Sequence, residues 1–152
     1  MTDEFYSGNW EGYYSYGTGY SEARRKIKVG FHIKMVLQNE VLSGTCEELI
    51  TRVHMGQPAV LSGRIDGGRI HFIKQYRYFF EFNGRGDIEI SRSRTSHPVC
   101  YTGTFDQVMK IFTGDWKIGH PSGRDGESDP FSGSWEMWKI RDQGPLLRRS
   151  RG

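Results

Sequence analysis

Lys74 is the side chain with the clearest chemical potential, because it lies in an otherwise apolar stretch of the chain. Within the segment 69–76 (RIHFIKQY), Lys74 alternates in step with Ile70, Phe72 and Tyr76. On a strand, this parity places an ammonium group inside an apolar interior, where an unpaired charge is costly. One interpretation puts Lys74 near an open rim, with its stem on apolar surface and its charge in water. In the other, it anchors a ligand carboxylate, or has a lowered pKa suited to Schiff-base chemistry.

Large aromatic side chains of the same inward parity supply the rest of a candidate ligand site. Tyr and Trp carry polar groups that need partners when they are buried. These side chains either fill the interior completely or line a partly open cavity in which their polar groups contact a ligand. Together with Lys74, the cavity candidates are Trp10, Tyr14, Phe31, Phe72, Tyr76, Tyr101, Trp116 and Trp135.

The histidines and cysteines form no local metal-binding or catalytic motif. The 5 histidines lack a His-Glu-x-x-His spacing, and the 2 cysteines lack a Cys-x-x-Cys spacing. His32 and His71 have outward parity, which favours surface positions. Cys46 has inward parity, typical of a structural thiol, and Cys100 has outward parity, so neither a disulfide nor a Cys–His pair is favoured. We therefore predict no metal, no cofactor and no catalytic residues.

A repeated strand unit must position these side chains. The unit reads apolar, Ser or Thr, Gly, polar, apolar, charged, so that the two apolar residues and the Gly share one face of a strand. The polar residues share the other face, as expected of a sheet with one buried and one solvated side. Its copies are YSGNWE at 6–11, LSGTCE at 42–47, LSGRID at 61–66, YTGTFD at 101–106, FTGDWK at 112–117 and FSGSWE at 131–136.

The inward glycines of this unit favour a closed barrel over a flat sandwich. A missing side chain on the inner face allows a strand to coil sharply or a neighbouring strand to approach closely. Further strands are predicted at 26–37, with Ile27 as its first inward residue, at 69–78, and in a hairpin over 79–90. The sequence therefore predicts an all-β fold, a single antiparallel up-and-down barrel of roughly 8–10 strands. The segment 48–55 is compatible with a helical turn or a strand, and 119–130 with a loop over the barrel mouth or a crossover.

These strand phrases resemble those of a known superfamily. LSGTCEE at 42–48, LSGRIDGGRIHFIKQY at 61–76 and YTGTFD at 101–106 look like strands of calycin barrels, which include avidins, lipocalins and fatty-acid-binding proteins. SGNWEGYYSYG, from Ser7, is similar to the Gly-x-Trp opening of that group. The resemblance implies a barrel with a cavity open at one end that holds small organic molecules. Cys46 stands where avidins usually have a tyrosine, so biotin binding is not predicted.

The composition limits the classes of partner. Lys plus Arg number 21 and Asp plus Glu 18, a formal net charge of +3 that gives no argument for nucleic acid. No apolar stretch approaches the roughly 20 residues of a membrane-spanning helix, and the N-terminus lacks the features of a secretory signal. We expect a barrel domain over 1–140 and a basic tail over 141–152, either a solvated terminus or a contact for an anionic partner. The expected location is the cytoplasm, with the chain a monomer or homodimer.

The leading functional hypothesis is non-covalent binding of a small hydrophobic or amphipathic molecule in the barrel. A second hypothesis is an isomerase- or cyclase-type enzyme that uses Lys74 or a buried Tyr as acid or base, and it requires a strongly shifted pKa in the cavity. A third is a protein-interaction module, which requires a filled barrel and a large exposed apolar surface.

Overall fold

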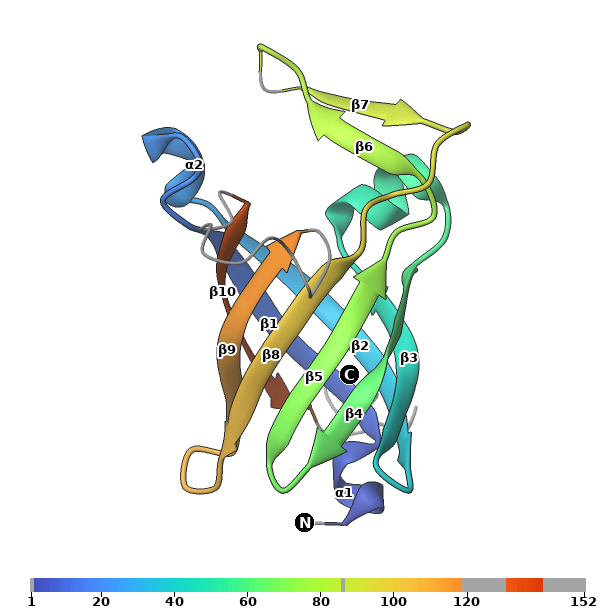
Figure 1. Ribbon diagram of the computed structural model, residues 1–152, viewed down its shortest axis with the longest axis vertical. Coiled ribbons are helices and arrows are strands. Elements are labelled where there is room, and N and C mark those ends of the chain that lie inside the picture. Colours follow the sequence, from blue (N-terminus) through green and yellow to red (C-terminus); the bar gives the residue numbers. More distant parts are fainter. Residues whose placement is uncertain (1, 86, 119–130, 141–152) are drawn as a thin grey trace, which may run out of the picture.

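The computed structural model describes residues 2–85, 87–118 and 131–140, and its core is a closed antiparallel barrel (Figure 1). The barrel strands follow one another around the wall in chain order, and β1 closes it by pairing with β10. This confirms the all-β, up-and-down barrel predicted from the alternating pattern. The barrel strands are β1 (Gly8–Tyr16), β2 (Lys28–Gln38), β3 (Val41–Glu47), β4 (Ala59–Asp66), β5 (Arg69–Gln75), β8 (Val99–Asp106), β9 (Ile111–Ile118) and β10 (Ser132–Lys139).

The elements outside the wall lie at the two ends of the barrel. A separate hairpin of β6 (Phe79–Phe82) and β7 (Ile88–Ser91) is inserted between β5 and β8 and extends beyond one end (Figure 1). The helices α2 (Glu22–Arg25) and η1 (Thr51–Met55) lie at this same end, whereas α1 (Asp3–Tyr6) lies at the opposite end. The segment 48–55, which was compatible with a helical turn or a strand, is therefore partly helical. The loop at 119–130 and the basic tail at 141–152 fall outside the described residues.

The repeat unit places its apolar residues in the barrel interior in nearly every copy. The first and second apolar positions are buried in the copies beginning at residues 6, 42, 61, 101 and 112. Phe131 is the exception: it was expected to point inward, but it precedes β10 and is 50% exposed. Ile27 was also expected inward, yet it precedes β2 and is 43% exposed. Both residues lie one position before the first residue of their strand, where the alternation alone does not ensure burial.

The inward glycines bring adjacent strands into close contact. A Cβ atom built on Gly114 would overlap with the carbonyl oxygen of Thr102 on β8, and one built on Gly63 with the carbonyl oxygen of His71 on β5. The inward glycines at 44, 103 and 133 meet neighbouring backbone in the same way. The absence of a side chain at these positions therefore allows the strands to coil into a small barrel.

The end of the barrel near α1 is filled by aromatic rings. Trp10 is fully buried, contacts Phe105 and Phe112 with ring centroids 6.5 and 5.3 Å apart, and donates its indole N–H to the carbonyl oxygen of Tyr6, 2.9 Å away. Tyr6 belongs to α1 and also packs on Phe105 at 5.7 Å. The short helix therefore closes this end with apolar packing. Any cavity must lie toward the other end.

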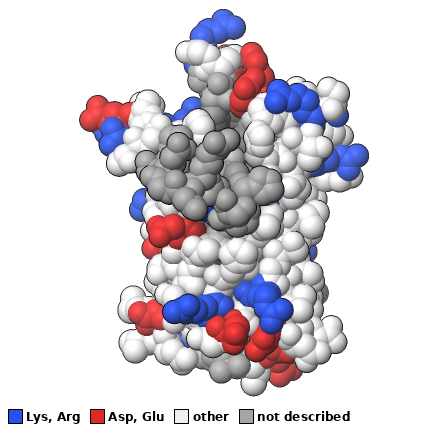
Figure 2. Space-filling model, viewed as in Figure 1, with Lys and Arg blue, Asp and Glu red and all other residues white. Residues whose placement is uncertain are grey.

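The described surface mixes charges of both signs. On the face shown in Figure 2, Lys and Arg side chains alternate with Asp and Glu, mostly toward the two ends of the molecule. Within the described part of the chain, no helix is long and apolar enough to cross a membrane.

Candidate ligand-binding site

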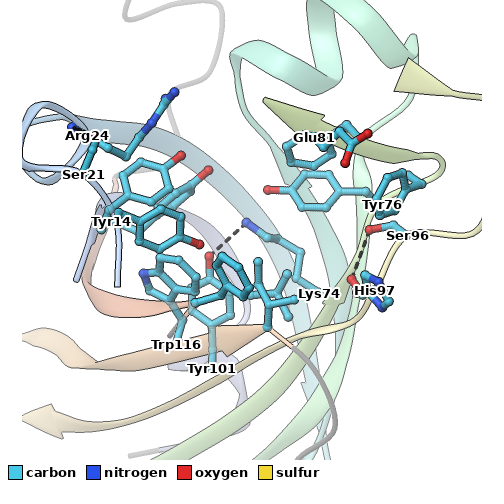
Figure 3. A pocket seen from close by; sticks show the side chains of 17 residues that line it. Tyr14, Ser21, Arg24, Lys74, Tyr76, Glu81, Ser96, His97, Tyr101 and Trp116 are labelled. Carbon is cyan, nitrogen blue, oxygen red and sulfur yellow. Dashed lines mark hydrogen bonds between the residues drawn. The ribbon is translucent and has the colours of Figure 1, made fainter. Parts of the chain in front are cut away.

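A pocket of about 550 Å³ opens at the barrel end that lies under the β6–β7 hairpin (Figure 3). Its wall combines barrel strands with α2, the first strand of the hairpin and the segment that leads into β8. Most lining side chains are aromatic or aliphatic, which is typical of sites for small organic molecules. The lining residues are Tyr14, Tyr16, Tyr20, Ser21, Arg24, Lys74, Tyr76, Phe79, Phe80, Glu81, Ser96, His97, Val99, Tyr101, Trp116, Ile118 and Phe131.

A buried ion pair between Lys74 and Glu48 lies at the floor of this pocket. The Lys74 Nζ atom is 2.5 Å from Glu48 Oε2, and the two side chains are 2% and 0% exposed. The interpretation of Lys74 as a rim residue with its charge in water is therefore wrong. Its counter-charge comes from a residue of the same chain, which meets the requirement that a buried charge be paired.

Three tyrosines and a cysteine also form hydrogen bonds with this pair. Tyr14 donates to Glu48 Oε1 at 2.9 Å, and Tyr76 donates to Glu48 Oε2 at 2.7 Å. Lys74 donates its second hydrogen bond to the Tyr101 hydroxyl oxygen at 2.9 Å. The Cys46 thiol lies 3.8 Å from Glu48 Oε2 and also donates to it. We refer to these six residues, 14, 46, 48, 74, 76 and 101, as the buried polar cluster.

The ammonium group of Lys74 is also surrounded by ring faces. It lies 4.7 Å from the ring centroid of Tyr14, 4.8 Å from that of Tyr76 and 5.1 Å from that of Tyr101. At these distances a cation is attracted to the negative face of each ring. The hydroxyl oxygen of Tyr101 and the three ring faces therefore all stabilise the charge of Lys74.

Glu48 reaches the interior because the inward alternation of β3 continues for one more step. Cys46 and Glu48 are buried on either side of the exposed Glu47. The chain then turns: the backbone N–H of Glu48 donates to Thr51 Oγ1 at 2.9 Å, and the same hydroxyl donates to the Glu48 carbonyl oxygen at 2.8 Å. This reciprocal pair fixes the backbone on which the carboxylate is carried. Thr51 is also the first residue of η1, which ends at Met55 and is followed by Gly56 with a positive φ of 69°.

The pKa values of the three cluster tyrosines, of Cys46 and of Lys74 are all raised. Burial raises the pKa of Tyr14, Tyr76 and Cys46, and the nearby Glu48 carboxylate raises each of them further. Burial also raises the pKa of Tyr101, although the positive charge of Lys74 opposes that shift.

Burial alone would lower the pKa of Lys74, but the Glu48 carboxylate more than offsets it, and the pKa is raised. The lowered pKa that Schiff-base chemistry would need is therefore not found.

The cavity candidates chosen from parity fall into two groups. Tyr14, Lys74, Tyr76, Tyr101 and Trp116 line the pocket together. The others, Trp10, Phe31, Phe72 and Trp135, are buried in the core and do not line it.

The core group lies deeper in the barrel and supports the pocket from behind. Phe72 stacks on the Tyr101 ring with centroids 4.7 Å apart, and Phe31 stacks on Tyr14 at 6.4 Å. Trp135 contacts Tyr101 at 5.6 Å. Parity separates inside from outside but does not give depth along the barrel axis, so it could not distinguish these residues from the pocket lining.

Several residues of the site were missed in the sequence. Glu48 was left in a segment of undecided structure, although extension of the alternation from Cys46 would have placed it inside. Arg24 comes from α2, Phe80 from the hairpin and His97 from the segment before β8. These elements lie outside the barrel wall, so only the tertiary structure shows that they reach the pocket.

The histidine and cysteine positions agree with parity, although Cys100 is buried. His71 is exposed, and His32 is half-buried, with its Nε2 atom 2.9 Å from Asn9 Oδ1. Neither Cys46 nor Cys100 is in a disulfide, and both are buried, so the outward parity of Cys100 does not make it exposed. Its outward parity sets the face of the wall but not what covers that face. Among the residues that the structure describes, no three His, Cys, Asp or Glu side chains gather to form a metal site.

The fold and the site together define a closed antiparallel β-barrel with a polar-floored pocket at one end. No protein-family model matches the chain, and no curated protein matches it either.

Proposed function

We propose that this protein binds a small, largely apolar organic molecule in the pocket beneath the β6–β7 hairpin. The observation that carries the proposal is the division of the barrel interior, since aromatic packing fills the α1 end whereas about 550 Å³ remains open at the other. That volume lies within the usual range for small-molecule sites, and its mixture of apolar walls and a few polar groups is also typical. A barrel with a pocket open at one end is also what the resemblance to calycins implies. The analogy of fold adds support to ligand binding, and it is part of the same proposal.

Catalysis is the weaker interpretation of the same cavity. An acid or base that works near neutral pH needs a pKa close to that pH. The pKa values of Lys74, of the three cluster tyrosines and of Cys46 are all raised away from neutrality. These groups therefore remain protonated, which suits hydrogen-bond donation to a bound molecule better than proton abstraction.

Titration with the uncharged fluorophore N-phenylnaphthylamine tests the proposal. We expect saturable binding of one molecule per chain, with blue-shifted emission from an apolar site. Ile118→Trp introduces a large ring into the pocket lining and should weaken binding by at least about tenfold, roughly 1.4 kcal/mol. Val60→Trp is the matched control, because Val60 is 59% exposed on the outer face of β4.

The two variants must first show the same cooperative unfolding as the wild type. Equal loss of binding in both, or no saturable binding by the folded wild-type protein, would argue against a ligand pocket.

A further inference from the structure

The hydrogen-bond inventory of the buried polar cluster indicates which chemical group a ligand would present to the pocket floor. This inference rests on the proposed binding function and deepens it. Glu48 Oε1 accepts from Tyr14, and Glu48 Oε2 accepts from Lys74, Tyr76 and the Cys46 thiol. The strongest acceptor of the cluster is therefore occupied by the protein itself.

The donor side of the inventory is not closed. Lys74 has three N–H hydrogens, and two of them are directed to Glu48 and Tyr101. Tyr101 accepts that bond through its oxygen, and an ammonium group cannot accept a bond in return, so the Tyr101 O–H hydrogen has no acceptor among the described residues. Both side chains are 2% exposed, and both line the pocket. A buried donor without an acceptor costs free energy that a suitable ligand atom would recover.

These two donors are close enough to meet a single ligand atom. The Lys74 nitrogen and the Tyr101 oxygen are 2.9 Å apart and face the pocket side by side (Figure 3). A carbonyl oxygen has two lone pairs and can accept from both at once.

The charge balance of the floor favours an uncharged acceptor. Glu48 neutralises Lys74 at 2.5 Å, so the floor has donors but little net positive charge. An anionic ligand would bring a second negative charge close to Glu48 and would lose its own hydration, which is costly in a buried site. Arg24 also lines the pocket, but its side chain points away from the Lys74 ammonium, toward the mouth (Figure 3).

We propose that the ligand is an uncharged molecule with a flat apolar body and a carbonyl oxygen, which accepts hydrogen bonds from Tyr101 and Lys74 at the pocket floor. The body contacts the aromatic wall, of which Trp116 and Phe80 are part. The carbonyl oxygen accepts the hydrogen bonds that Lys74 and Tyr101 can still donate after Lys74 has bonded to Glu48.

Equilibrium dialysis with three probes of similar size and shape tests this assignment. The probes are β-acetonaphthone, which has a neutral carbonyl, β-isopropenylnaphthalene, which has the same outline without an acceptor, and β-naphthoate, which is anionic. Tyr101→Phe removes the free hydroxyl hydrogen and should weaken β-acetonaphthone binding by about 5- to 10-fold while leaving β-isopropenylnaphthalene unchanged. Tyr13→Phe is the control, because Tyr13 lies on the outer side of β1 against Lys28 and Trp138.

The outcomes separate this inference from the function on which it rests. Retained β-isopropenylnaphthalene binding shows that Tyr101→Phe still folds around an intact pocket. If Tyr101→Phe affects the two neutral probes equally, the carbonyl assignment is overturned and the pocket stands. Tighter binding of β-naphthoate than of β-acetonaphthone by the wild type overturns the uncharged class in favour of an anion. Failure of every probe, with no N-phenylnaphthylamine binding, overturns the proposed function as well.

Discussion

Removing the charge of Glu48 tests whether the buried polar cluster is held together by its ion pair. Glu48→Gln keeps the size of the side chain and one carbonyl oxygen, but it leaves the Lys74 ammonium in the interior without a counter-charge. The control is Glu47→Gln, because Glu47 is the exposed neighbour on the same strand and makes no described ion pair. We expect Glu48→Gln to be strongly destabilising and Glu47→Gln to be near neutral.

The magnitude follows from the geometry and from the alternative open to Lys74. At 2.5 Å and an effective dielectric constant of about 20, the lost attraction between Glu48 and Lys74 is roughly 6–7 kcal/mol. Part of this loss is offset, because the variant no longer buries a charged carboxylate. Lys74 can instead release its proton, and deprotonation at pH 7 from an ordinary pKa near 10.4 costs about 4–5 kcal/mol. Because the protein adopts the less costly state, the free energy of unfolding should fall by about 3–5 kcal/mol. For a chain of this size, that corresponds to a decrease in Tm of about 6–20 °C.

Urea unfolding of the single variants and of Glu48→Gln combined with Lys74→Met is the assay. The double variant replaces both charges, so it should recover most of the lost stability. The pH dependence gives a second readout. In Glu48→Gln the folded-state pKa of Lys74 should lie below its unfolded value, so stability should rise with pH through that range, opposite to the wild type. A single variant within about 1 kcal/mol of the wild type, or a double variant no more stable than the single, would refute the reasoning.

Three further predictions concern the wall, the thiols and the alkaline range. Gly114→Ala should lower the free energy of unfolding by at least about 1–3 kcal/mol, because the added Cβ would overlap with β8. Gly30→Ala should have a far smaller effect, because a Cβ at Gly30 would lie 3.9 Å from the nearest atom of a neighbouring strand. Equal effects of the two variants in urea unfolding would contradict the close-approach argument. Cys46 and Cys100 should react slowly with a thiol reagent in the native state and rapidly after denaturation, and a fast native phase at either would be inconsistent with their burial. The raised pKa values of Cys46, of the three cluster tyrosines and of Lys74 mean that the folded state holds protons which the unfolded state releases above its ordinary pKa values of 9.0 for Cys, 10.0 for Tyr and 10.5 for Lys. Wild-type stability should therefore be fully present below about pH 9 and decline as the pH rises above it, and a flat profile from pH 8 to 11 in urea unfolding would count against these shifts.

The barrel could be predicted from the sequence because the pattern that specifies its strands lies within short segments of the chain. Each copy of the repeat alternates buried and exposed residues over a few positions, and the Gly at its centre indicates where strands approach closely. Gly114 and Gly63 make those approaches. The same alternation predicted that Tyr14, Lys74 and Tyr101 would point inward, and they do.

The site was only partly predictable, because its key contacts join distant parts of the chain. Glu48 and Lys74 are 26 positions apart and meet because β3 and β5 flank β4 in the wall. The sequence placed Lys74 on the inward face but left open whether its charge reached water, and it did not show the partner, so the sign of the pKa shift could not be known. Phe131 and Ile27 show a second limit, since the alternating pattern does not indicate where a strand begins.

The closure of the barrel by β1 and β10 has a consequence for how the chain folds. Ser15 and Ser134 face each other across this seam with their hydroxyl oxygens 3.0 Å apart, although 119 positions separate them in the chain. On the ribosome, β1 therefore emerges well before β10, and one of its edges stays unpaired until β10 has been synthesised. Such long-range pairing slows folding, and an open strand edge can pair with another nascent chain in the meantime. The Ser15–Ser134 seam is accordingly where an assembling barrel is most vulnerable to aggregation, even though the finished wall has no free edge there.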